Sequence, residues 1–146
     1  MALKLETGFV QSFPAMIQQA GVGQPAWLSG WFGFWSALLA SNPVPFAYTI
    51  IALELLLSLS LIFGVMRKVS YCGGFLLSMS IWAIPEGFGG PYGPGSTDIG
   101  PGIIYAFVFV LFMILDATHG PSGWTLDRII EKRWPKWDSI AEMKGK

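Results

Sequence analysis

Glu54 is the ionisable residue that lies deepest within an apolar stretch of the sequence. It is the one charged residue of Val44–Met66, VPFAYTIIALELLLSLSLIFGVM. A carboxyl group near the middle of a membrane is costly, so it should face other helices, be paired, or be protonated. Two interpretations stay open. Glu54 relays a proton or hydrogen-bonds a quinone head group, or it is a neutral structural side chain bonded to a neighbouring helix.

A second set of residues that could do chemistry surrounds the loop Pro85–Gly102, PEGFGGPYGPGSTDIGPG. Eleven of its eighteen residues are Gly or Pro, and it has two acids but no Lys or Arg. Beside membrane helices such a loop can shape a backbone-lined pocket, or it can be a plain connector. Its aromatic rings and carboxylates could receive an amphipathic ring such as a quinone, or could form an aromatic belt with helix-capping acids. In the second case Asp98 or Thr97 would cap the third span. The candidate contacts to a quinone or lipid are Glu54, Trp82, Glu86, Tyr92, Asp98 and Tyr105.

The sequence lacks the residues on which most self-contained catalytic and metal sites depend. With one cysteine, Cys72, and one histidine, His119, it offers neither a Cys-based zinc site nor two histidine ligands for haem. It has no CxxC, HExxH, P-loop, GxSxG or dinucleotide-binding motif. We therefore expect no metal and no cofactor bound by this chain alone, and a catalytic residue is unknown. A quinone would bind at a site shared with another chain.

Composition indicates that these residues are positioned by membrane helices. The chain is 53% hydrophobic and 12% charged, whereas soluble domains have about 25% charged residues. Its seven Trp are typical of proteins whose rings lie at the membrane–water interface. The formal net charge is zero, which removes any bulk-charge argument for nucleic acid as a partner.

Three stretches are predicted to span the membrane as helices. They are Val44–Met66, Val69–Pro85 and Gly102–Thr118. The first is long enough to span with some tilt, and the other two are near the short limit. Arg67 and Lys68 are expected to end the first span, and Pro101 suits the start of a helix.

The two ends of the chain are predicted to lie at the membrane surface. Residues 8–20 fit a short amphipathic helix, and Pro25–Ala40 is short and rich in aromatic rings. We favour an interfacial helix or helical hairpin at 25–40, with a fourth span as the alternative. The tail contains six of the nine Lys and Arg, and its apolar residues recur at helical spacing from near Thr125 until Pro135 breaks the pattern. This tail is expected to lie on the membrane or on a partner.

Charge predicts the orientation. With three spans threaded, Arg67, Lys68 and the tail cations fall on one side, and Lys4 falls on the other. The positive side is normally cytoplasmic, so loop 85–102 and the N-terminal region face outward. We expect a multi-pass protein in the plasma membrane of a prokaryote, with a cytoplasmic tail.

Three motifs together resemble the DoxX/DoxD group of small membrane proteins. They are Glu54 followed by GVMRK, the acidic Gly/Pro loop with Glu86 and STDIG, and GPSGWTLD at 120–127. The resemblance covers roughly residues 44–127, and the loop looks closest to the DoxD branch. That branch includes the small subunit of thiosulfate:quinone oxidoreductase, so the resemblance implies a quinone-linked activity. The group usually has four spans, and here either the first is lacking or Pro25–Ala40 takes an unusual path.

Taken together, these patterns predict an all-α integral membrane protein with a single domain, residues 1–146. It comprises an interfacial region (1–43), a transmembrane bundle (44–118) and a cytoplasmic amphipathic tail (119–146). The function we expect is that of a small subunit of a quinone-linked respiratory or electron-transfer complex, with other membrane subunits and lipids as partners. The alternatives are a DoxD-like catalytic subunit of thiosulfate:quinone oxidoreductase and a purely structural subunit of another large membrane assembly.

Overall fold

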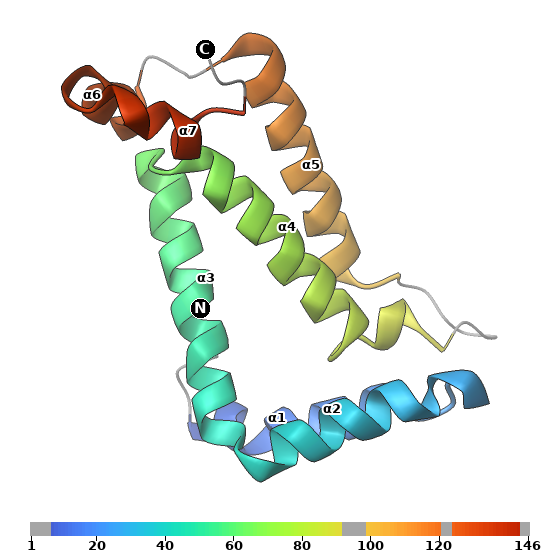
Figure 1. Cartoon of the computed structure of the whole chain (residues 1–146). Helices are drawn as coiled ribbons and strands as arrows, with labels where there is room; N and C mark the ends of the chain where they lie inside the picture. Colours follow the sequence, from blue (N-terminus) through green and yellow to red (C-terminus); the bar gives the residue numbers. More distant parts are fainter. Residues whose placement is uncertain (1–6, 92–98, 121–123, 144–146) are drawn as a thin grey trace. The chain divides into compact units, whose positions relative to one another are not determined.

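The computed structural model describes residues 7–91, 99–120 and 124–143, and every regular element in these ranges is helical (Figure 1). The elements in chain order are α1 (Thr7–Ala20), η2 (Ala26–Leu28), α2 (Ser29–Ser41), α3 (Pro43–Phe63), α4 (Arg67–Ala83), η3 (Gly87–Gly89), α5 (Pro101–His119), α6 (Leu126–Arg133), η4 (Pro135–Trp137) and α7 (Asp138–Ala141). The prediction of an all-helical protein is therefore confirmed for the described residues.

Two of these helices are long and apolar enough to cross a membrane. They are α3, with 21 residues and a mean hydropathy of 2.1, and α5, with 19 residues and a mean hydropathy of 2.0. Helix α3 ends three residues before the predicted end of the span, because Gly64 takes a left-handed backbone (φ +60°) that stops the helix. Helix α4 has 17 residues, at the lower limit of length for a membrane span.

The helices form two compact units. The first contains residues 1–53 and 79–103, and the second contains residues 54–78 and 104–146. Helices α3, α4 and α5 each contribute residues to both units.

In the first unit, α1 packs against α2. The core of this contact consists of Phe13 and Ile17 from α1 and Leu39 from α2, with Ile17 fully buried. The predicted amphipathic helix at 8–20 is confirmed as α1. The stretch Pro25–Ala40 forms a short 3-10 turn and a single helix, α2, whose 13 residues fall short of the roughly 17–25 needed to cross a bilayer.

In the second unit, Gly74 of α4 lies against Phe109 of α5. A Cβ atom placed on Gly74 would lie 2.3 Å from Cζ of Phe109, so this contact depends on the missing side chain. Ring contacts between Tyr71 and Phe112 and between Phe109 and Phe112 extend the packing. Close contact between α4 and α5 in this unit is therefore made by glycine and aromatic rings.

The tail begins and breaks where the sequence predicts. Thr125 precedes the first turn of α6, and the helix ends at Arg133, two residues before Pro135. Part of its predicted apolar face stays exposed, since Ile129 is 64% exposed and Trp134 is 63% exposed, whereas Ala141 of α7 is fully buried. What α6 turns inward is a charged residue, Asp127, which is fully buried.

Candidate functional site

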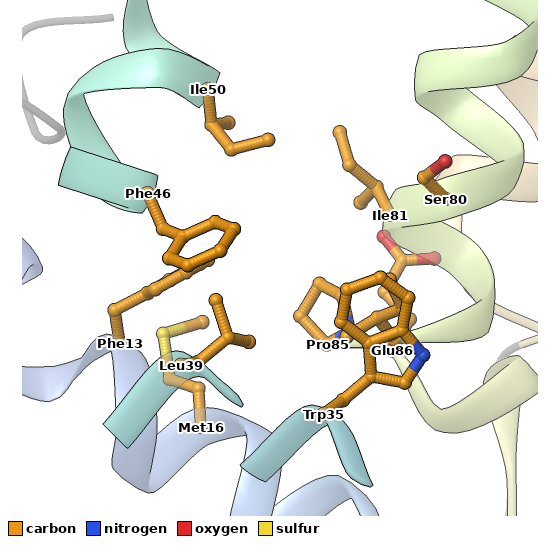
Figure 2. Close-up of a pocket in the computed structure, with 11 residues that line it drawn as sticks. Phe13, Met16, Trp35, Leu39, Phe46, Ile50, Ser80, Ile81, Pro85 and Glu86 are labelled. Atoms are coloured by element: carbon orange, nitrogen blue, oxygen red, sulfur yellow. The ribbon is translucent and has the colours of Figure 1, made fainter. Parts of the chain in front are cut away.

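The first unit contains a cavity of about 320 Å³. Figure 2 shows its walls, with α1 and α2 contributing side chains from one side and α3 and α4 facing each other across it. The lining residues are Phe13, Met16, Trp35, Leu39, Phe46, Ile50, Ser80, Ile81, Ile84, Pro85 and Glu86. Nearly all are apolar, and Glu86 is the one charged residue among them. Ligand pockets in proteins are commonly about 300–1,000 Å³, so this cavity has room for one substituted ring.

The cavity wall is fixed by a hydrogen bond between helices that are distant in sequence. Trp31 of α2 donates from Nε1 to the carbonyl oxygen of Ala83, the last residue of α4, at 3.0 Å. Beneath the cavity, Phe13 and Leu39 belong to both the α1–α2 core and the cavity lining. The apolar floor is therefore continuous with the core of this unit.

Glu86 links the cavity to the start of α5. The backbone N–H of Gly102 donates to both carboxylate oxygens, at 3.1 Å to Oε1 and 2.9 Å to Oε2. This N–H is one of the donors that the first turn of a helix leaves without an internal partner. Gly100 (φ +93°) allows the close approach, because a Cβ atom there would lie 2.6 Å from Oε2 of Glu86. Negative charge at this place is also favoured by the helix dipole of α5.

The part of the Gly/Pro loop next to Glu86 is anchored by aromatic rings and polar bonds. Phe88 packs edge-on against Trp82, with ring centroids 5.2 Å apart, and also contacts the rings of Trp31 and Phe32. Trp82 donates from Nε1 to the carbonyl oxygen of Ile99 at 2.9 Å. Gln24 donates to the carbonyl oxygen of Gly87 at 2.8 Å. These contacts hold the described loop residues beside the cavity.

Only some of the predicted contacts to a quinone or lipid lie at or beside the cavity. Glu86 lines the cavity, and Trp82 secures the adjoining loop. Tyr92 and Asp98 lie outside the described residues, as does the alternative cap Thr97. Glu54, which is partly buried, and Tyr105, which is 60% exposed, belong to the second unit.

A cluster of buried charges in the second unit was missed by sequence reasoning. Arg67 donates from Nη1 to Asp116 at 2.9 Å and from Nε to Asp127 at 3.1 Å. The three side chains are 0–4% exposed. Arg67 was predicted to end the first span and to mark the cytoplasmic side, but its side chain lies inside the fold with two acids. The available signal was that one arginine and two aspartates all fall near the ends of helices on the same predicted side.

Asp127 caps the start of α4, although it lies far from that helix in the sequence. Its Oδ1 accepts from Met66 N–H at 2.7 Å, and its Oδ2 accepts from Arg67 N–H at 3.1 Å, at the start of α4. Trp137 also donates to Oδ1, at 2.8 Å. Asp116 uses its second oxygen to accept from Met143 N–H at 3.0 Å. The cluster therefore joins α4, α5 and the tail within this unit, a structural role.

Among the described residues, the cavity is suited to binding a ligand, and the cluster of Arg67, Asp116 and Asp127 holds parts of the second unit together. The cavity offers an apolar enclosure with one carboxylate, and the cluster uses its carboxylate oxygens on partners within the chain. Compared with protein-family models, with curated proteins and with solved structures, the chain matches none of them.

Proposed function

We propose that this protein is a small integral membrane subunit of a quinone-linked respiratory or electron-transfer complex, which it stabilises and whose quinone site it borders. Helices α3, α4 and α5 would be its three spans, in the plasma membrane of a prokaryote. The tail would lie at the cytoplasmic face, and loop 85–102 would lie outside, as the distribution of Lys and Arg favours.

The observation that carries this proposal is the exposure of the two membrane-length helices. Only 6% of the apolar stretch of α3 and 22% of that of α5 is buried within the chain. A core helix of a soluble protein would be mostly buried, because its apolar surface must be removed from water. Helices this apolar and this exposed need lipid or another membrane chain around them. A complex of several chains supplies that cover.

The cavity supports the quinone part of the proposal. Its volume suits one substituted ring, its walls are mostly apolar, and Glu86 supplies the one charged group among the lining residues. These are the features that a pocket for a membrane-soluble ring compound requires.

The motifs behind the DoxX/DoxD resemblance have a shared structural task, which supports membership of that group as a proposal. Arg67 from GVMRK and Asp127 from GPSGWTLD are ion-paired, and Asp127 also caps the start of α4. Glu86 from the loop caps the start of α5 near STDIG. The enzymatic version, a DoxD-like subunit of thiosulfate:quinone oxidoreductase, follows from the resemblance alone.

The proposal is tested by purifying the tagged full-length protein from native membranes in a mild detergent and identifying the chains that accompany it. We expect integral membrane subunits and a redox-active subunit in stoichiometric amounts, together with extractable quinone. A matched purification of Leu56→Trp, which enlarges a side chain that is 63% exposed on α3, should reduce the recovery of partner chains if they pack on that face. Recovery of the wild-type chain as a lone monomer under conditions that preserve known complexes contradicts the proposal.

A further inference from the structure

We infer that the cavity selects a neutral ring compound that donates a hydroxyl hydrogen bond, a hydroquinone in preference to the corresponding quinone. This inference rests on the proposed function, because it states which redox form of the quinone the site holds. It is carried by the acceptor chemistry of Glu86 within an apolar enclosure.

The enclosure sets the size and the apolar character of the ligand. Its volume of about 320 Å³ admits a single ring with small substituents, and its other lining side chains are apolar except for Ser80 and the indole N–H of Trp35. Figure 2 shows rings and aliphatic side chains from α1, α2 and α3 facing Glu86 and Ile81 on the α4 side. A ring in this space buries its faces against carbon atoms, which is favourable because apolar surface is removed from water.

Glu86 determines the kind of polar group that the ligand should bring. Both of its oxygens already accept from Gly102 N–H, so the side chain acts as an acceptor at the start of α5. A carboxylate oxygen has further lone pairs but no hydrogen to donate. A hydroquinone can donate one hydroxyl to Glu86 and can also accept from the indole N–H of Trp35, a buried donor without a hydrogen-bond partner among the described residues. A quinone could accept from Trp35, but a carbonyl oxygen placed at Glu86 would meet another negatively polarised oxygen. Hydrogen bonds to charged groups are also the stronger ones, which makes this difference large.

Charge decides against other ligands for the same carboxylate. An anion such as thiosulfate would meet Glu86 in a wall with no Lys or Arg among its lining residues. A cationic amine would have to leave water for an apolar space, which is costly. Glu86 does not need such a cation, because the N-terminus of α5 already favours its negative charge. A neutral donor avoids both costs.

The test measures equilibrium binding of three matched probes to the purified full-length chain in detergent micelles under anaerobic conditions. The probes are duroquinol, which has two hydroxyl donors, duroquinone, which has two carbonyl acceptors, and the dimethyl ether of duroquinol, which has no donor. Wild-type protein and Glu86→Gln are compared by titration calorimetry, with empty micelles subtracted. The ratio of the duroquinone Kd to the duroquinol Kd in each protein is the readout, because partition of each probe into micelles cancels between the proteins.

We expect this ratio to be roughly tenfold or more larger in the wild type than in Glu86→Gln, as loss of a hydrogen bond to a charged acceptor implies. The dimethyl ether should bind both proteins alike. Glu142→Gln, which removes a carboxylate that is not among the lining residues, should keep the wild-type ratio. Equal ratios in wild type and Glu86→Gln overturn the inference.

Ile50→Trp provides a second variant that leaves Glu86 in place and puts a larger side chain into the cavity. All three probes should then bind more weakly than to the wild type. Binding of duroquinol that is unaffected by Ile50→Trp shows that the cavity is not its site and also overturns the inference. Failure here is distinguishable from failure of the proposed function, because the first is read from probe binding to the isolated chain and the second from the chains that accompany it.

Discussion

Nε of Arg67 lies 3.1 Å from Oδ2 of Asp127, and this ion pair joins the first residue of α4 to the second residue of α6. Both side chains are almost completely buried, with exposures of 4% for Arg67 and 0% for Asp127. Asp127 also accepts backbone N–H bonds from Met66 and Arg67, so it combines an ion pair with a helix cap. The stability of the second unit should therefore depend strongly on this one carboxylate.

Asp127→Asn should destabilise the protein by about 3 kcal/mol or more, because it removes the charge that opposes a buried arginine. In this variant Asp116 still pairs with Arg67, so the buried arginine keeps one opposite charge beside it. The measurement is the free energy of unfolding in detergent, followed by Trp fluorescence. Glu142→Gln is the control and should change that free energy by no more than about 0.5 kcal/mol. Equal stability of Asp127→Asn and wild type would show that the buried pair is not needed.

Trp137→Phe should cost about 1.5–3 kcal/mol, because it removes the indole N–H that donates to Asp127 at 2.8 Å. The same substitution at Trp134, which is 63% exposed, should have little effect. Thermal unfolding of the two variants in the same detergent compares them directly. A Trp134→Phe variant that is less stable than Trp137→Phe contradicts this assignment.

Gly74→Ala and Gly73→Ala should have effects of opposite sign. At Gly74 the added Cβ would meet the ring of Phe109 at 2.3 Å, so α4 and α5 must separate or the ring must move, at about 1–3 kcal/mol. At Gly73 no atom lies within 4 Å of the added Cβ, and alanine is the better helix former by up to about 1 kcal/mol. Unfolding free energies of both variants test the close packing of α4 on α5. The prediction fails if both variants shift stability in the same direction.

The proposed topology is tested with single cysteines introduced in a Cys72→Ser background. A membrane-impermeant maleimide applied to intact cells should label Pro91→Cys in the outer loop but not Lys136→Cys in the tail. Inverted membrane vesicles should give the reverse pattern. Labelling of both positions from the same side would mean that one of the three proposed spans does not cross the membrane.

Much of the helical architecture could be predicted from local sequence patterns. Pro101 begins α5, Thr125 precedes α6, and the tail breaks just before Pro135, as predicted. These positions are readable because proline removes a backbone donor and threonine favours the position before a helix. The end of α3 was placed three residues too late, because the apolar stretch continues past the left-handed turn at Gly64.

The candidate site was only partly predictable. The sequence singled out Glu86, and the structure adds that its carboxylate accepts from Gly102 N–H at the start of α5. The predicted cap by Thr97 or Asp98 falls outside the described residues and stays a prediction. The cavity that Glu86 lines is formed by side chains from α1, α2, α3 and α4. No periodicity within one helix reports how four helices meet, so the cavity could not be read from the sequence.

The sequence by itself determined that the chain is helical and that α3 and α5 are apolar over a membrane-spanning length, because these properties depend on neighbouring residues. Tertiary structure alone decided that Arg67 turns inward to Asp116 and Asp127, which lie 49 and 60 residues further along the chain. Burial makes those charges depend on each other, since a desolvated arginine is tolerated only beside carboxylates. The same long-range packing turned Glu86 from one of several acids near a loop into the polar wall of a cavity.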